Sequence, residues 1–515
     1  MSNRKYCPFS RVVLFFMLGA VLAPAFVQAQ NPFADFPQRV EAARKQWGAP
    51  GLAIAVVHKD QVVLAAGFGV RDVSTGEAVN EHTLFHVGST TKAFTAVAAG
   101  LLVEEGRLAW NDKIIDHLPA FRVADPYVTR ELTVLDLLTH RSGVQGTDLL
   151  WVTGLSSDQF LSRLVHAEQA SSLRSQFEYN NGMYLIAGQL VGTVGGSSYA
   201  DFVRKRLFQP LGMSRTTGPL HEIAQRENVA ISHEVIDGKM TPIGLTDQYD
   251  AGGAGLFYSS VAEYASWLRM WLKEGKLGQK QILKPETVSM AFTPQMVIQQ
   301  SLYPASQAAG VDLVSYGLGW FLHEYRGRRV NMHTGSIDGM SAIVGLMPEA
   351  RVGVVVFINA DHIELRHALM YETFDRALGG EFQDWSGELH SLYTSIAERS
   401  QERRARQLAS LDSDAEAVLP LNDYAGSFRH ELFGDLEITH QAGLLRVSVS
   451  RLLALDLKPA GSHRFLGYPL RRGFEDAPDS KKYGDPSLVQ FEIGPDNRPR
   501  RVLMLGQEFE RMREN

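Results

Sequence analysis

Ser89 and Lys92 are three positions apart and lead into a run of small and apolar residues at 93–99. Residues at positions i and i+3 of a helix lie on the same face, so we expect Lys92 beside the Ser89 hydroxyl. A serine hydroxyl becomes a strong nucleophile when a neighbouring base removes its proton. Burial lowers the pKa of a lysine, which would let Lys92 act as that base. The alternative is a buried helix that Ser89 merely caps, and the same spacing recurs at Ser2 and Lys5.

A second segment with chemical potential is Tyr179-Asn180-Asn181, which precedes an apolar stretch at residues 185–194. A tyrosinate could act as a general base if nearby cations lower its pKa. The amide of Asn181 could hydrogen-bond a substrate carbonyl and orient Lys92. The alternative is a helix start with a packed aromatic side chain at Tyr179.

A third segment is His333-Thr334-Gly335-Ser336, which follows an apolar region at residues 318–322. We expect this segment to form an edge strand. Gly335 would then let the strand backbone approach a ligand closely.

The elements that would hold these segments in place can be predicted from hydrophobic patterning. Short apolar strands are expected at residues 52–57 and 62–66, and a mostly helical region extends from the Ser89 helix to about residue 272. Strands return at residues 317–324, 329–334, 341–347 and 352–359, and a closing helix is expected at 362–378. This order predicts an α+β fold, with one mixed antiparallel sheet flanked by helices and a helical subdomain. The functional site would lie in the cleft between sheet and subdomain.

In this order the three segments resemble the motifs of the penicillin-recognising serine hydrolases. This family (peptidase S12) includes class C β-lactamases, D-Ala-D-Ala carboxypeptidases, and related esterases and D-aminopeptidases. Further stretches resemble it at residues 50–52, 67–69, 137–143, 208–213 and 316–320. The resemblance covers roughly residues 38–380 and implies a β-lactamase/transpeptidase-like fold.

The resemblance implies that Ser89 is the nucleophile and that Lys92 and Tyr179 form its proton-transfer network. An acyl-enzyme on Ser89 would then be hydrolysed or passed to another amine or alcohol. No metal and no other cofactor is implied. His82 and His86 are four residues apart without an HExxH motif, and we expect both to be structural or surface residues.

The resemblance also implies a set of substrate-binding residues: Asn181, His333, Thr334, Gly335 and Ser336. The backbone N–H groups of Ser89 and Ser336 would form the oxyanion hole. His333 departs from the lactamase pattern, because it stands where a lysine would offer a fixed cation to a substrate carboxylate. A neutral imidazole lacks that charge near pH 7.

We therefore expect a serine hydrolase of the peptidase/esterase type that cleaves a peptide, amide or ester through an acyl-enzyme on Ser89. One alternative is a β-lactamase or D-alanyl-D-alanine carboxypeptidase. A second alternative, from a different class, is a non-catalytic binder of cell-wall peptides. The expected partner is a small-molecule or peptide substrate in each case.

The bulk composition describes a soluble globular protein with two or more domains. The chain has 515 residues, of which 45% are hydrophobic and 21% are charged, and a formal net charge of -6. The charge argues against a nucleic-acid binder, which would show a basic excess.

The N-terminal segment predicts export. Arg4 and Lys5 precede an apolar run at residues 12–22, and small residues at 27 and 29 indicate a signal peptide that is cleaved after Ala29. The only cysteine, Cys7, lies in the removed part. We expect a periplasmic or secreted protein with no integral membrane segment after signal removal.

The C-terminal part has a different pattern. Residues 384–418 are charged and alanine-rich and predict a helical linker, whereas short alternating strands from residue 419 to 515 predict a small antiparallel β-barrel. The barrel resembles the lipocalin-like domain that follows many members of this family. It could serve structure or homo-oligomer assembly, or form a lid or wall of the substrate site. The predicted domains are thus 1–29, 30–383, 384–418 and 419–515.

Overall fold

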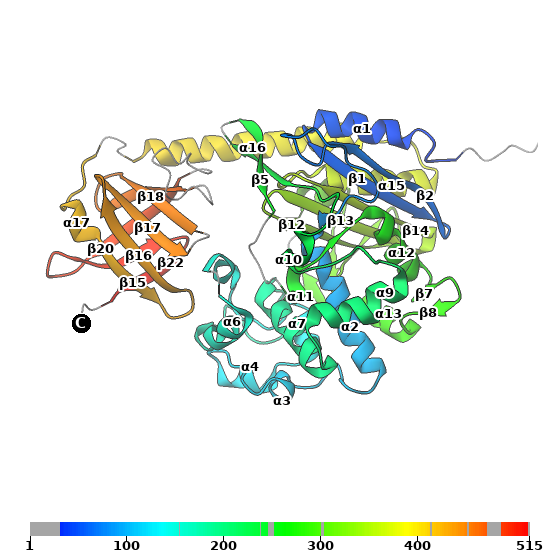
Figure 1. The fold of residues 1–515 in the computed structure, drawn as a ribbon, viewed down its shortest axis with the longest axis horizontal. Helices are drawn as coiled ribbons and strands as arrows, with labels where there is room; N and C mark the ends of the chain where they lie inside the picture. Colours follow the sequence, from blue (N-terminus) through cyan, green and yellow to red (C-terminus); the bar gives the residue numbers. More distant parts are fainter. Residues whose placement is uncertain are drawn as a thin grey trace, which may run out of the picture.

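The computed structural model describes residues 31–153, 155–236, 238–245, 252–299, 303–411, 415–450, 453–470 and 486–512. The predicted signal peptide, residues 1–29, lies outside the described residues. A sheet-centred unit with a helical subdomain is followed by a barrel, which lies at the left of Figure 1. Among the described helices, none is long and apolar enough to cross a membrane.

An antiparallel sheet of eight strands forms the centre of the first unit, in the order β2-β1-β14-β13-β12-β11-β10-β9. Neighbouring strands pair antiparallel throughout. The strand bounds are β1 Gly51–His58, β2 Gln61–Gly69, β9 Met296–Ile298, β10 Val314–Tyr316, β11 Phe321–Tyr325, β12 Arg328–Ile337, β13 Met340–Met347 and β14 Val352–Ile358.

Helices cover both faces of the sheet, which explains why β1 and β14 are continuous apolar runs rather than alternating ones (Figure 1). One face packs against α1 (Phe36–Gln46) and α15 (Leu365–Leu378) and receives the β1 side chains Leu52, Ile54 and Val56. The other face packs against α12 (Val261–Leu272) and the helical subdomain and receives Ala53, Ala55 and Val57.

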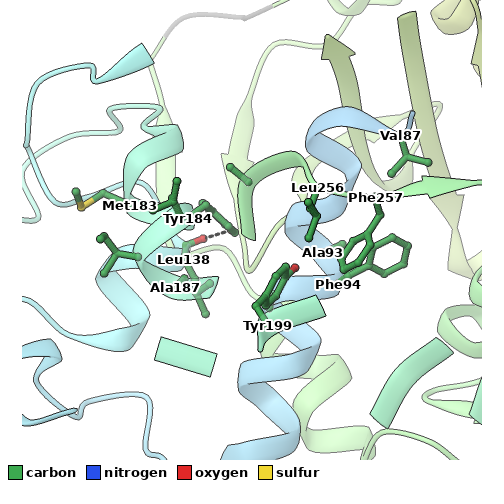
Figure 2. Packing of buried hydrophobic residues seen from close by; sticks show 14 of the residues in the cluster. Val87, Ala93, Phe94, Leu138, Met183, Tyr184, Ala187, Tyr199, Leu256 and Phe257 are labelled. Atoms are coloured by element: carbon green, nitrogen blue, oxygen red, sulfur yellow. Dashed lines mark hydrogen bonds between the residues drawn. The ribbon is translucent and has the colours of Figure 1, made fainter. Parts of the chain in front are cut away.

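The helical subdomain is built around α2 (Thr91–Glu104), whose side chains are buried from Thr91 to Leu102. Its other helices are α3 Ile114–His117, α4 Pro126–Glu131, α5 Val134–Leu138, α6 Ser157–Arg163, α7 Asn181–Gly195 and α8 Tyr199–Val203. Figure 2 shows Phe94 of α2 beside Phe257, and Tyr184 of α7 donating a hydrogen bond of 2.6 Å to the Leu138 carbonyl. Within the same core, α2 and α7 contact each other directly.

Two details of the sheet differ from the sequence-based prediction. The predicted strand at residues 317–324 begins too early: residues 317–320 form the turn between β10 and β11, in which Gly319 has a φ of +77°, and only residues 321–324 lie in β11. A Cβ at Gly319 would lie 2.8 Å from the backbone nitrogen of Ala93, so only glycine lets this turn touch α2. The predicted edge position of the His333 strand is also wrong, because β12 pairs with both β11 and β13. Pairing with β11 ends at Met332, however, and residues 333–337 pair with β13 alone.

The helix α16 (Trp385–Ala409) leads from the first unit to the barrel and is drawn in yellow in Figure 1. Trp385 is 2% exposed and Leu389 is fully buried, and both pack in the core that contains α15. The first turns of the predicted linker, residues 384–418, therefore carry side chains of the first unit's core.

Eight antiparallel strands then close into a barrel: β15 Gly426–His430, β16 Gly434–Gln441, β17 Leu444–Ser450, β18 Leu453–Pro459, β19 Arg464–Pro469, β20 Ser487–Ile493, β21 Pro499–Met504 and β22 Gln507–Arg511. Its core is filled by apolar side chains such as Phe428, Leu457 and Phe491. The predicted fold class is confirmed: an α+β unit with an antiparallel sheet, flanking helices and a helical subdomain, followed by a small antiparallel barrel.

Candidate active site

Ser89 lies in a tight turn at the start of the central helix of the subdomain. The short strand β3 (Phe85–His86) leads into a 3₁₀ turn, η1 (Gly88–Thr90), and α2 begins directly after it. Gly88 has a φ of +52°, and a Cβ there would lie 2.7 Å from the backbone nitrogen of Ser336. A Cβ at Gly335 would lie 2.1 Å from the carbonyl oxygen of Val87. Because both positions are glycine, the end of β12 reaches the Ser89 turn at backbone distance.

Lys92 lies one turn after Ser89, and its side chain is fully buried. Its Nζ is 2.9 Å from Ser89 Oγ, 2.7 Å from Asn181 Oδ1 and 3.0 Å from the Ala254 carbonyl oxygen. Burial lowers the pKa of Lys92 to about 7, and the Asp148 carboxylate opposes this effect in part. A neutral amine can donate both hydrogens to the two carbonyl-type oxygens and accept the Ser89 proton with its lone pair.

The two asparagines of the second segment have different positions. Asn180 is the N-cap of α7, and its Oδ1 accepts a hydrogen bond from the Met183 N–H at 3.2 Å. Asn181 is the first residue of α7 and turns its amide toward Lys92. The structure thus brings Asn181, as predicted for the site, to the Ser89-Lys92 pair, and it uses Asn180 to begin the helix.

Tyr179 lies on the other side of the lysine, with its ring centroid 4.9 Å from Lys92 Nζ. Burial raises the pKa of Tyr179 well above its ordinary value, and a hydrogen bond with Ser89 opposes this only in part. The side chain is therefore a neutral phenol near pH 7, in contrast to the tyrosinate that the sequence suggested. A neutral phenol in hydrogen-bond contact with Ser89 can pass a proton in either direction.

The third segment contributes unevenly to the site. Ser336 lines a pocket of ≈ 190 Å³ beside Ser89. His333 is only 1% exposed, and its Nε2 lies 3.0 Å from Tyr316 Oη. Burial lowers the pKa of His333 to about 3, so this imidazole is neutral near pH 7. Thr334 is buried as well, and neither His333 nor Thr334 is among the described residues that line the pocket.

The described lining of the pocket beside Ser89 comes from five parts of the chain that are far apart in sequence. Its described lining consists of His86, Gly88, Ser89, Asp148, Asn181, Ala254, Gly255, Ser336, Ile337 and Asp338. Two carboxylates belong to this lining, at Asp148 and Asp338. The neutral Ser89, Asn181 and Ser336 supply hydroxyl and amide groups.

Asp148, which begins the 3₁₀ helix η2 (Asp148–Thr153), is not among the predicted site residues. Its Oδ1 accepts a hydrogen bond of 3.1 Å from Asn181 Nδ2, while Asn181 Oδ1 faces Lys92. The barrel strand β17 contacts η2, and Arg163 of α6 donates a hydrogen bond of 3.0 Å to the Glu431 carbonyl of the barrel. No local pattern in the sequence marked Asp148, because its importance comes from this long-range packing.

Two further buried residues were also missed. The His140 ring lies 4.3 Å from the Tyr179 ring, and its Nδ1 accepts a hydrogen bond of 2.9 Å from the Asn180 N–H. Arg366, 2% exposed, donates hydrogen bonds to the Gly335 carbonyl at 2.7 Å and to Ser336 Oγ at 2.9 Å. Both residues hold backbone or side-chain groups of the site in place. His140 had been noted only within the segment 137–143 that resembles the family.

The site thus consists of a serine-lysine pair in a glycine-flanked turn, which lies between an antiparallel sheet and a helical subdomain. A family model described as Beta-lactamase matches residues 36–375, which include every site residue discussed above, and the chain belongs to this family.

Named relatives agree with this assignment. The chain is 28% identical over 447 residues to "Unguisins hydrolase ungD" of Aspergillus violaceofuscus, covering 82% of this chain and 79% of that protein. It is 29% identical over 333 residues to "Penicillin-binding protein 4" of Amycolatopsis lactamdurans, covering 63% of this chain and 85% of that protein. Among solved structures, the octameric penicillin-binding protein homologue from Pyrococcus abyssi superimposes with a TM-score of 0.59 at 20% identity, over 92% of this chain and 99% of that chain. This last similarity concerns the fold.

Proposed function

We propose that this protein is a serine hydrolase that cleaves a peptide, amide or ester through an acyl-enzyme on Ser89. The observation that carries the proposal is the distance of 2.9 Å between Ser89 Oγ and Nζ of a fully buried Lys92. With its pKa lowered to about 7, Lys92 is available as a neutral base under ordinary conditions. A lysine that only filled the core would not need a hydroxyl and an amide oxygen converging on it.

In the acylation step, neutral Lys92 takes the Ser89 proton while Oγ attacks the substrate carbonyl carbon. The N–H groups of Ser89 and Ser336 stabilise the negative charge that develops on the carbonyl oxygen. Gly88 and Gly335 allow the backbones of these two serines to approach each other. Each such donor is typically worth about 3 kcal/mol in the transition state. The bond to the leaving amine or alcohol then breaks, and the leaving group takes up the proton held by Lys92.

Tyr179 is well placed to carry that proton. Its neutral phenol contacts Ser89, so it can donate its hydrogen to the leaving group and take the proton from Lys92. In the second step Lys92 removes a proton from water, the resulting hydroxide attacks the ester on Ser89, and Ser89 regains its hydrogen as the carboxylic acid is released.

The neutral state of His333 supports esters or amides without a free carboxylate as the preferred substrates. The relatives' names support hydrolase chemistry in general, since one is named as a hydrolase and one as a penicillin-binding protein. We also propose that the chain is exported, from the signal-peptide pattern at residues 1–29. Mass measurement of the protein secreted by its host would test this, because the mature form should lack those residues.

Labelling with a fluorophosphonate probe tests the proposed chemistry directly. Intact mass should increase by one adduct in the wild-type protein and in Ser400→Ala, an exposed serine on α16 that serves as control. Ser89→Ala should not be labelled. An adduct that persists in Ser89→Ala would show that another group is the nucleophile.

A substrate panel then separates the alternatives. The purified mature protein should be assayed with chromogenic esters, aminoacyl amides, peptides and nitrocefin, and the hydrolysis rates should be compared. Faster hydrolysis of nitrocefin or a D-Ala-D-Ala peptide than of a simple ester would favour the β-lactamase or carboxypeptidase alternative. A folded protein that is neither labelled nor active on any of these would favour the non-catalytic binder.

A further inference from the structure

His140 lies beside Tyr179, two residues after the end of α5. Its side chain is fully buried. The centroids of the two rings are 4.3 Å apart and their planes differ by 32°, so the imidazole packs nearly face to face with the phenol. The rings of Tyr184 and Tyr316 also lie 5.0 Å from the imidazole. His140 is thus enclosed by aromatic rings, and one of them belongs to the proposed proton relay.

His140 also holds the backbone on both sides of Tyr179. Its carbonyl oxygen accepts a hydrogen bond of 2.8 Å from the Glu178 N–H, and its Nδ1 accepts one of 2.9 Å from the Asn180 N–H. Burial lowers the pKa of His140 well below its ordinary value, so the ring is neutral near pH 7 and Nδ1 can accept. One residue therefore fixes the chain directly before and directly after the phenol.

The position is unfavourable for a histidine in two respects. The backbone of His140 has a φ of +55°, in the left-handed region that residues with side chains seldom adopt. Because Nδ1 accepts, the ring hydrogen is on Nε2, and this buried atom has no hydrogen-bond partner among the described residues. Backbone strain and an unpaired buried donor both destabilise a fold. Strain of this kind is concentrated at functional sites, and the contacts of His140 lead to Tyr179.

We propose that His140 is a positioning residue for the proton relay, which fixes the Tyr179 phenol where it can protonate the leaving group. The proposal rests on the proposed function, because it requires an acyl-enzyme on Ser89. In that reaction Tyr179 Oη gives its hydrogen to the leaving oxygen or nitrogen and regains one from Lys92. The two hydrogen bonds set the backbone of Tyr179, and the packed imidazole limits movement of its ring. A displacement of about 1 Å can lower a rate about a hundredfold.

The leaving group separates this role from a general loss of structure. p-Nitrophenolate leaves an ester as a stable anion, whereas the oxygen of an ethyl ester must be protonated as its bond breaks. The measurement is kcat/KM for ethyl butyrate divided by kcat/KM for p-nitrophenyl butyrate, which share one acyl group. A misplaced Tyr179 should lower this ratio, because only the ethyl ester depends on the phenol. A smaller fraction of folded protein lowers both rates equally and leaves the ratio unchanged.

Two variants of similar shape isolate the Nδ1 hydrogen bond. In His140→Asn the amide oxygen can accept from the Asn180 N–H, and asparagine tolerates a positive φ, so the ratio should stay close to that of wild type. His140→Leu has no acceptor, and its ratio should fall by about tenfold or more. The control is His463→Leu in the barrel, where the histidine also has a positive φ, of +60°, and its Nδ1 contacts Tyr424 Oη at 2.7 Å. This control should keep the wild-type ratio.

A double variant tests whether His140 acts through Tyr179. Tyr179→Phe alone should lower the ratio at least as far as His140→Leu does. Adding His140→Leu to Tyr179→Phe should then change the ratio little, because the phenol that His140 positions is absent. If His140→Leu does not fold, His140→Gly takes its place, since glycine fits the positive φ and offers no acceptor. A wild-type ratio in a folded variant without the acceptor, or an equal fall with and without the phenol, overturns the proposal.

Fluorophosphonate labelling of the same samples separates the two levels of failure. A wild-type protein that is labelled on Ser89, with variants of His140 that keep its ratio, refutes the positioning role and leaves the proposed hydrolase function standing. A folded wild-type protein that is not labelled and hydrolyses neither ester refutes the hydrolase function, and the role of His140 falls with it.

Discussion

The titration of Lys92 gives a sharp prediction for Asp148→Asn. In wild type, the rate constant for fluorophosphonate labelling should rise with pH and reach half its maximum near pH 7, because only neutral Lys92 can remove the Ser89 proton. Three neighbouring groups, His86, His333 and Tyr179, do not titrate in this window. Burial lowers the pKa values of His86 and His333 to about 3, and it raises that of Tyr179 well above 10.

Removing the Asp148 charge should move this midpoint to lower pH. Asn181 bridges the two groups, with 2.7 Å from Lys92 Nζ to Oδ1 and 3.1 Å from Nδ2 to Asp148 Oδ1. The charges of Lys92 and Asp148 are thus at most about 8 Å apart, a separation worth about 0.5 kcal/mol in water and about 2 kcal/mol at an effective dielectric constant of about 20. Because one pKa unit equals about 1.4 kcal/mol, the midpoint should fall by about 0.4 to 1.5 pH units.

The assay is the second-order rate constant of labelling between pH 5 and 9, followed by intact mass for wild type and Asp148→Asn. Asp312→Asn, at an exposed acid in the loop before β10, is the control. The control should keep the wild-type midpoint. A wild-type midpoint above pH 9 would mean that Lys92 is not desolvated as the structure places it. A midpoint that stays in place or rises in Asp148→Asn would refute the electrostatic link between the two residues.

Three further predictions concern the site and the fold. Tyr179→Phe should lower turnover by about a hundredfold while the labelling midpoint stays near pH 7, because the phenol relays a proton that Lys92 first removes; a shifted midpoint would assign the titration to Tyr179. Asp136→Asn should reduce the free energy of unfolding by about 3 kcal/mol, as measured in urea, because this fully buried carboxylate receives Arg141 at 2.6 Å and Arg174 at 2.7 Å. Burial alone would raise the Asp136 pKa, but hydrogen bonds from Arg174 and Thr133 lower it. The free energy of unfolding of the wild-type protein should therefore fall as pH drops below about 4. A similar fall in Asp136→Asn would contradict this explanation. Trp385→Ala should lower the free energy of unfolding of the full chain by about 3 to 5 kcal/mol, since this indole packs 5.1 Å from the Tyr371 ring and donates a hydrogen bond to Asp375 at 2.9 Å. A loss below about 1 kcal/mol would mean that Trp385 belongs to the linker and not to the core of the first unit.

The local part of the site could be predicted because it depends on spacing within single elements. Ser89 and Lys92 meet through the turn of one helix, and Asn181 reaches them because it starts a second helix packed on the first. The long apolar runs of β1 and β14 likewise predicted strands, and they are apolar throughout because a strand buried on both faces has no polar side.

The remaining features depend on contacts that no local pattern records. Tyr179-Asn180-Asn181 offers two asparagines, and only the packing of α7 decides that Asn180 caps the helix and Asn181 faces the lysine. The open edge at the end of β12 exists because β11 stops at a glycine turn that packs against α2. Sequence alone likewise could not show that the His333 imidazole is buried against Tyr316 and Phe321; its substrate-binding role stays a prediction.

The charges around Ser89 suggest how substrate choice and base strength are connected. Arg366 cannot supply a free cation to the pocket, because Glu364 pairs with it at 2.7 Å and it also donates to the Gly335 and Ala342 carbonyls and to Ser336 Oγ. Asp148 is then the charge that most directly opposes the effect of burial on Lys92. A cationic acyl group bound at Asp148 would cancel that opposition, so the Lys92 pKa should be lower in the complex than in the free enzyme. The pH midpoint of kcat for a cationic substrate, the p-nitrophenyl ester of trimethylglycine, should accordingly lie below that of kcat/KM. The neutral p-nitrophenyl ester of 3,3-dimethylbutyric acid, which has the same shape, should show no such downward shift. If the difference between the kcat and kcat/KM midpoints is the same for both esters, then binding of a cationic acyl group does not change the Lys92 pKa.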